Sequence, residues 1–165
     1  MEEKSKREVT EQGAYLQLTS LCARSEHCQH DMLEKMRKWN MSDEAQARVM
    51  QRLIQERFVD DERYARAFVR DKIHYNKWGR RKVEQALWMK RIDDNIREQV
   101  LNEVDDEEYL AVLKPLLQQK RRSTKAKSDY ELNQKLVKFA FQRGFTMDII
   151  RQCINSDVVD IDEED

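Results

Sequence analysis

The chain repeats one pattern of apolar positions three times. The first copy consists of Met32, Met36, Met41, Ala45 and Val49. A shift of 51 residues carries it onto Val83, Leu87, Ile92, Ile96 and Val100, and a further shift of 53 carries it onto Leu136, Ala140, Phe145, Ile149 and Cys153. Apolar residues four apart share one face of a helix. Each copy therefore predicts two amphipathic helices joined by a turn.

A third helix is predicted before each pair. The segment Asp-Asp-Glu-Arg-Tyr at 60–64 recurs as Asp-Asp-Glu-Glu-Tyr at 105–109. Acidic residues are favourable at a helix N-terminus, where Asp also accepts hydrogen bonds from free backbone N–H groups. The predicted helices lie near 10–23, 28–39, 43–56, 60–76, 80–90, 93–102, 105–121, 129–142 and 146–155. The fold class is predicted to be all-α, with three tandem three-helix repeats in an extended, curved array.

The repeat also predicts the domain organisation. The three units are expected at 10–58, 59–104 and 105–156, each with its own small core. The tails 1–9 and 157–165 contain too little apolar surface to offset ordering entropy, so both are predicted to be disordered. With three Gly and one Pro, the composition favours helices over strands.

The turn between the second and third helix of each unit is expected to need a residue in the left-handed conformation, followed by an apolar anchor. Asn40 and Gly144 fit this requirement. Arg91 does not fit, because a side chain at positive φ costs about 1 kcal/mol relative to Gly.

The net charge of −1 conceals alternating charged blocks. Residues 63–91 and 110–143 have net charges of +8 and +7, whereas 92–109 and 144–165 have −7 and −6. Such blocks predict one basic face that binds nucleic acid or an acidic partner. A solvated charged surface is the alternative.

Two dense basic runs supply most of the candidate binding residues. The first is Lys77, Arg80, Arg81 and Lys82, and the second is Lys120, Arg121, Arg122, Lys125 and Lys127. Arg80, Arg81 and Lys82 begin a predicted helix, where positive charge is unfavourable unless an anion binds. Trp88 either stacks on a base or contacts a partner, or else is a half-buried packing residue. The candidate nucleic-acid or filament contacts are Lys72, Lys77, Arg80, Arg81, Lys82, Trp88, Lys90, Arg121, Arg122, Lys125, Lys127 and Arg143.

The sequence contains no sign of a catalytic, cofactor or metal site. It has no phosphate-binding glycine loop, no Gly-x-Ser-x-Gly and no His-Glu-x-x-His. Cys22, Cys28 and Cys153 have no disulfide-framework spacing, and the histidines near Cys28 match no zinc pattern. With no long apolar run and a charged N-terminus, the chain is expected to be a cytoplasmic non-enzyme without cofactor or membrane contact.

The segment 58–65, Phe-Val-Asp-Asp-Glu-Arg-Tyr-Ala, resembles the RecX family of recombinase regulators. The resemblance continues through Trp78-Gly79, Lys90-Arg91-Ile92 and Arg143-Gly144-Phe145, and spans roughly 12–155. Arg57, Lys77 and Arg91 stand where that family usually has Gly, and Cys28 replaces a Ser-type cap.

The resemblance implies a monomeric regulator that binds the RecA filament and inhibits its ATPase and strand exchange in recombination and DNA repair. It also implies binding to single- or double-stranded DNA, which the acidic C-terminus weakens. Two alternatives are a stand-alone DNA-binding protein and a peptide-binding helical scaffold with a similar repeat length.

Overall fold

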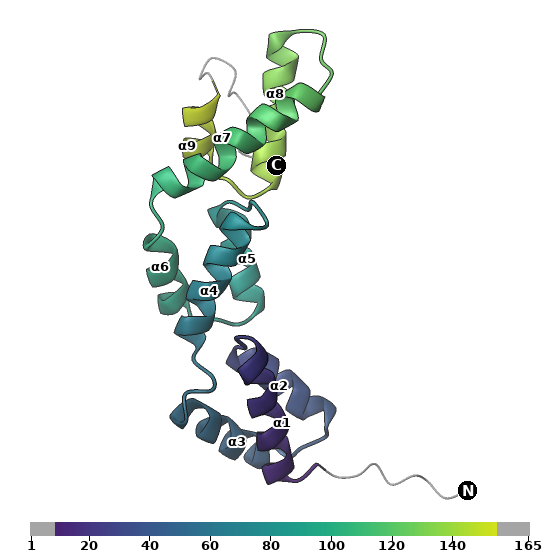
Figure 1. The fold of residues 1–165 in the computed structure, drawn as a ribbon, viewed down its shortest axis with the longest axis vertical. Coiled ribbons are helices and arrows are strands. Elements are labelled where there is room, and N and C mark those ends of the chain that lie inside the picture. Colours follow the sequence, from purple (N-terminus) through teal and green to yellow (C-terminus); the bar gives the residue numbers. More distant parts are fainter. Residues whose placement is uncertain (1–8, 155–165) are drawn as a thin grey trace, which may run out of the picture.

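A computed structural model describes residues 9–154 and contains nine helices and no strand in that range (Figure 1). The helices are α1 (Glu11–Arg24), α2 (Gln29–Lys38), α3 (Asp43–Gln55), α4 (Asp61–His74), α5 (Arg80–Met89), α6 (Asp94–Asn102), α7 (Asp106–Ser123), α8 (Asp129–Gln142) and α9 (Met147–Cys153). The all-helical prediction is confirmed, and each helix lies within three residues of its predicted bounds.

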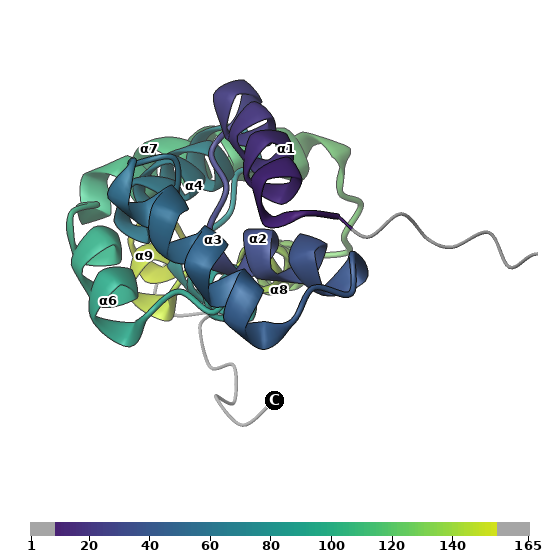
Figure 2. The ribbon, with the colours of Figure 1, turned by 90° about the horizontal axis from the view of Figure 1, so that it is seen from below.

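The helices form three successive triplets stacked end to end along one long axis (Figure 1). We call α1–α3, α4–α6 and α7–α9 the first, second and third unit. Seen along that axis, the units overlap in projection, as an elongated array requires (Figure 2). The predicted disordered tails lie outside the described residues, apart from Val9.

The repeated acidic segments begin helices as the sequence predicts. The Asp60 carboxylate accepts a hydrogen bond from the Arg63 N–H at 3.0 Å. The Asp105 carboxylate accepts the corresponding bond from Glu108, also at 3.0 Å. Both carboxylates thus satisfy a backbone donor that has no partner within its helix.

The same type of backbone hydrogen bond occurs in each of the three turns that join the second and third helices of a unit. The apolar residue after each turn donates its N–H to the carbonyl five residues earlier, an arrangement that ends a helix. The bonds are Met41 to Met36 at 3.3 Å, Ile92 to Leu87 at 3.2 Å and Phe145 to Ala140 at 3.2 Å. The residue before each anchor has positive φ: 56° at Asn40, 56° at Arg91 and 95° at Gly144. The turn geometry is therefore kept at Arg91 despite the cost of its side chain.

The first prediction follows from that cost. Arg91→Gly should raise the free energy of unfolding by about 0.5–1 kcal/mol, since the exposed side chain is held at positive φ. Urea denaturation measures the change. Arg91→Ala is the control, because it removes the guanidinium but keeps the strained backbone. Equal stabilisation by Ala and Gly would show that the charge, not the backbone, is unfavourable.

The cores differ from the prediction of one separate core per unit. The first unit has its own apolar cluster around Leu18, Met32, Met36 and Leu53. The second and third units share one continuous cluster. Sharing occurs because buried side chains of α4 and α7 meet where these units stack. The second and third units therefore form one packed body.

The contact between the first and second units is largely polar. Lys90 Nζ lies 2.7 Å from an Asp31 carboxylate oxygen, and Arg63 Nε lies 2.7 Å from Glu26. Cys28, at the start of α2, is the one buried apolar residue of the first unit that joins the shared core. Its burial raises the pKa of the thiol to about 12.

Between residues 9 and 154, no helix combines the length and apolar character that crossing a membrane needs. The same residues contain no group of three or more His, Cys, Asp or Glu side chains placed to hold a metal ion.

Candidate nucleic-acid interface

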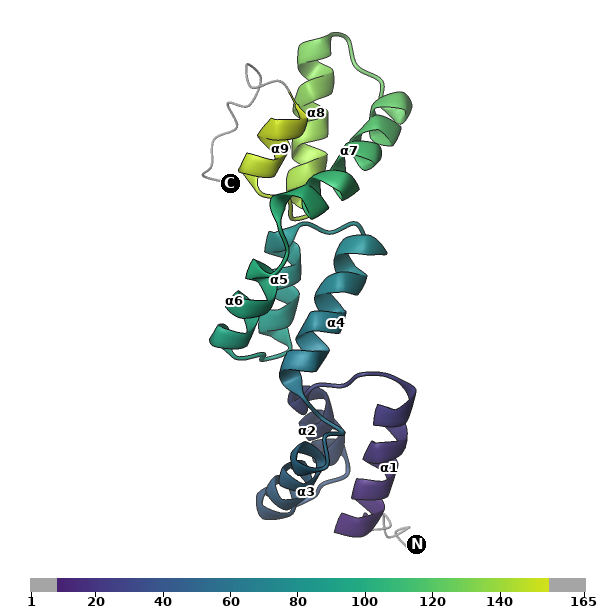
Figure 3. The same cartoon turned by 60° about the vertical axis from the view of Figure 1, so that its left-hand side comes forward.

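The second and third units are joined by backbone hydrogen bonds between the start of α5 and the turn after α8 (Figure 3). The Gly79 N–H donates to the Arg143 carbonyl at 2.9 Å, and the Arg81 N–H donates to the Gly144 carbonyl at 2.9 Å. Position 79 has no room for a side chain, because a Cβ there would lie 2.2 Å from Phe145 N. The junction is therefore a close approach of two backbones.

The Arg143 side chain fastens the same junction. Its Nη2 donates to the Asn76 carbonyl at 2.6 Å and its Nε to the Lys77 carbonyl at 3.1 Å. The guanidinium also lies 5.5 Å from the centre of the Phe139 ring. Arg143 thus holds the loop between α4 and α5 against α8.

Trp78 carries two lysines beside its ring. Lys72 Nζ lies 5.0 Å from the ring centre and Lys82 Nζ lies 4.6 Å from it. An ammonium group over an aromatic face is attracted to the ring's negative potential while it keeps access to solvent. Both lysines are thereby held in place without losing their charge to a carboxylate.

Together these contacts form what we call the junction cluster, a group of cations on α4, α5, α7 and α8 and the loops beside them. Lys120 joins it over Phe139 at 5.0 Å, and Arg81 stacks on Phe141 at 4.0 Å. Its six cations are Lys72, Lys77, Arg81, Lys82, Lys120 and Arg143. Within residues 9–154 none of the six forms an ion pair with a carboxylate. Uncompensated cations interleaved with aromatic rings suit a phosphate backbone.

The structure corrects one expectation about the basic run at the start of α5. Because positive charge is unfavourable at a helix start, the sequence predicts that removing Arg80, Arg81 and Lys82 leaves the stability unchanged or slightly higher. Instead, Arg80 Nη2 donates to Asn102 Oδ1 at 2.7 Å and its Nη1 to the Leu101 carbonyl at 3.4 Å. Arg80 therefore caps the C-terminus of α6, and removing it would cost stability. Lys82, in the same basic run, instead places its ammonium group over the Trp78 ring.

Trp88 lies on the outer face of α5. The residue is 62% exposed, as is Met89 beside it. The exposure contradicts the alternative of a half-buried packing residue and leaves the indole free to contact a partner.

Lys90 lies away from the junction cluster, at the contact with the first unit. Burial disfavours the ionised form of Asp31, but hydrogen bonds from Lys90 and Cys28 outweigh it and lower the pKa of Asp31. The same hydrogen bond raises the pKa of Lys90. The pair therefore stabilises the fold above the ordinary Asp pKa, and this contribution is lost as the pH falls through the lowered value.

The second prediction tests this pair. Lys90→Met should lower the melting temperature at pH 7 by about 3 °C, corresponding to roughly 1 kcal/mol for a partly exposed pair. The deficit should shrink as the pH falls below the ordinary Asp pKa and through the lowered pKa of Asp31. Calorimetry at pH 7 and pH 3 measures both values. A deficit of equal size at the two pH values would contradict an electrostatic origin.

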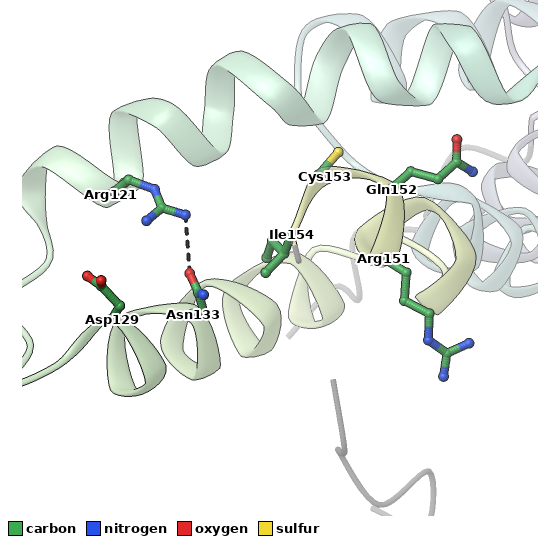
Figure 4. A pocket seen from close by; sticks show the side chains of 7 residues that line it. All are labelled: Arg121, Asp129, Asn133, Arg151, Gln152, Cys153 and Ile154. Atoms are coloured by element: carbon green, nitrogen blue, oxygen red, sulfur yellow. Dashed lines mark hydrogen bonds between the residues drawn. The ribbon is translucent and has the colours of Figure 1, made fainter. Parts of the chain in front are cut away.

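The second basic run occupies the far end of the third unit. Arg121 Nη2 donates to Asn133 Oδ1 at 3.2 Å across the gap between α7 and α8 (Figure 4). Arg122, Lys125 and Lys127 are exposed beside it, in α7 and the following loop. The structure thus separates the predicted site residues into the junction cluster, this distal run, Trp88, Lys90 and the capping residue Arg80.

Sequence reasoning missed the aromatic half of the junction cluster. Trp78, Phe139 and Phe141 are absent from the predicted binding residues. A usable signal was present, because Phe68–Lys72, Trp78–Lys82 and Phe139–Arg143 are each four residues apart. That spacing places a cation and a ring on the same side of a helix or its first turn.

Two models of known protein families match this chain and identify the family of its helical repeats. The profile described as "RecX, second three-helix domain" matches residues 60–101, and "RecX, third three-helix domain" matches residues 106–154. The two matches coincide with α4–α6 and α7–α9 and together cover more than half of the chain. This chain belongs to the RecX family.

Individual RecX proteins agree with this assignment. The chain is 27% identical over 143 residues to regulatory protein RecX of Bacillus cytotoxicus, covering 87% of this chain and 53% of that protein. It is 28% identical over 120 residues to regulatory protein RecX of Lactobacillus johnsonii, covering 73% and 44%. The chain spans about half the length of these relatives. Their names describe regulatory proteins rather than enzymes.

Solved RecX structures show the same fold. The crystal structure of RecX from Lactobacillus salivarius matches with a TM-score of 0.78 and 21% identity, over 87% of this chain and 93% of that one. A second crystal structure of regulatory protein RecX gives a TM-score of 0.79 and 19% identity, over 87% and 70%.

Proposed function

We propose that this RecX-family chain binds the filament that a RecA recombinase forms on DNA, and that it slows ATP hydrolysis and strand exchange by that filament. Family membership supports the choice of partner. The junction cluster is the observation that carries the proposal. On two units that share one core, it presents six cations that form no ion pair with any carboxylate in the described part of the chain, residues 9–154.

The elongated shape supports a mode of action. A stack of three units offers a long surface, so separate units can contact successive protomers of a filament at once. Contacts made by linked units reinforce one another through their high effective concentration. Binding across protomers would hinder the subunit movements that accompany nucleotide hydrolysis.

The testing experiment measures DNA-dependent ATP hydrolysis and strand exchange by the cognate recombinase as this protein is added. Both rates should fall at or below one protein per recombinase protomer. No change in either rate at saturating protein would contradict the proposal.

A stand-alone DNA-binding protein is the second candidate, which the junction cluster by itself would equally serve. Competition between bare single-stranded DNA and recombinase-coated DNA distinguishes the two. A regulator of the filament should prefer coated DNA at least tenfold, whereas a simple DNA-binding protein would bind bare DNA as well or better.

A further inference from the structure

A polar groove opens between α7, α8 and α9 on the third unit (Figure 4). Its volume is 670 Å³. It is lined by Arg121, Asp129, Asn133, Arg151, Gln152, Cys153 and Ile154. Arg121, Arg151 and Asp129 carry the charges of this lining, and Arg151 also forms an ion pair at 3.8 Å with Asp148. The positive charge that favours an anionic occupant therefore comes from the α7 side of the groove, at Arg121.

The neighbouring surface of α7 adds to the positive charge. Arg122 is exposed next to Arg121, and Lys120 belongs to the junction cluster. Lys114, two turns earlier in α7, lies close enough to Cys153 for its charge to oppose the rise in the thiol pKa that burial causes. Positive charge thus extends from one end of the groove wall to the other.

The sequence that follows the groove has the opposite charge. Ile154 lines the groove, and residues 155–165 continue directly from it. This segment contains no Lys or Arg and has six carboxylates, at Asp157, Asp160, Asp162, Glu163, Glu164 and Asp165.

The segment is long enough to cover the basic surface. Eleven residues reach up to about 36 Å when extended, whereas the part of α7 from Lys114 to Arg122 is about 12 Å long. Direct attachment at the groove gives such a segment an effective concentration in the millimolar range. Weak contacts between carboxylates and guanidinium groups are then sufficient for high occupancy.

We propose that the acidic segment 157–165 binds the groove and the adjoining cations of α7, and so competes with nucleic-acid phosphate for the third unit. The competition rests on the proposed function, but binding of the segment to the groove does not. Because Lys120 and Arg121 are neighbours, a bound segment places negative charge beside the junction cluster. A partner with dense phosphate charge, such as nucleic acid, would displace it.

A first experiment tests the groove without nucleic acid. The full chain with all six acids neutralised (D157N, D160N, D162N, E163Q, E164Q and D165N) is titrated against a fluorescent peptide of residues 155–165 in 20 mM salt. Fluorescence anisotropy should show saturable binding, and adding Arg121→Gln with Arg122→Gln should weaken it at least tenfold. Arg37→Gln with Lys38→Gln, on exposed residues of α2, is the matched control and should have no effect.

A second experiment measures competition. The neutralised chain should bind a single-stranded oligonucleotide about tenfold more tightly than the unmodified chain in 50 mM salt, and the difference should vanish in 0.5 M salt because the competition is electrostatic. Sedimentation of the unmodified chain should give the mass of a monomer, which places the segment on its own third unit.

The outcomes separate the two proposals. If the peptide binds the groove but neither chain binds oligonucleotide, the proposed function fails and the docking stands. If the peptide does not bind, or binds equally well without Arg121 and Arg122, the docking is overturned, even where neutralisation tightens oligonucleotide binding through general charge. A dimer that dissociates on neutralisation would also overturn it, because the segment would then occupy a second copy.

Discussion

Replacing Lys72, Lys82 and Lys120 together with Gln is expected to weaken binding of single-stranded DNA about a hundredfold in 0.1 M salt. Removing one lysine–phosphate interaction should reduce the salt slope by about 0.7, so removing three should reduce it by about 2. These lysines are suitable because their ammonium groups lie over aromatic rings rather than beside carboxylates. Titration by fluorescence anisotropy at several salt concentrations gives both the affinity and the slope.

The same variant should remain folded. An exposed cation–π interaction contributes about 0.5 kcal/mol, so its removal at these positions should lower the melting temperature by only a few degrees. Gln also keeps part of the aliphatic stem that packs on each ring. The matched control replaces Arg24, Arg37 and Lys38, exposed cations of the first unit, with Gln. An equal decrease in affinity in both variants would show that only net charge matters.

Gly79→Ala is expected to produce the largest decrease in stability, roughly 3 kcal/mol or more. The added Cβ would lie 2.2 Å from Phe145 N and 2.4 Å from Gly144 C, and backbone atoms cannot turn aside as a flexible side chain can. Relieving the clash would break the Gly79–Arg143 hydrogen bond and separate the second unit from the third. Urea denaturation measures the decrease.

Gly13→Ala provides the control for Gly79→Ala. Its added Cβ meets only the Thr10 hydroxyl at 3.0 Å, and Ala favours a helix over Gly. The change in stability should therefore stay within about 1 kcal/mol. If Gly79→Ala unfolds at the same urea concentration as the unmodified chain, the two backbones are not held in contact in solution.

The electrostatic contacts have different effects in the two halves of the array. Asp31 and Lys90 neutralise each other between the first and second units. In the junction cluster, five of the six cations lie over aromatic rings instead, so their charge stays available to a partner. Basic residues that are close in sequence therefore have different roles. Lys90 forms a structural ion pair at the first junction, whereas the junction cluster is a candidate binding surface at the second.

Local sequence patterns were enough to predict the helices found in residues 9–154, the acidic helix starts at Asp60 and Asp105, and the threefold repeat. These features depend on residues three to five positions apart, as between Asp60 and Arg63 or Met36 and Met41, so local spacing is sufficient to predict them. The shared core of the second and third units, the capping of α6 by Arg80 and the pairing of Lys90 with Asp31 follow from tertiary packing alone. The same packing brings Arg143 to the loop at Asn76, 67 positions away. Such contacts depend on how two helix ends meet in space, and side-chain periodicity along one helix contains no information about that meeting.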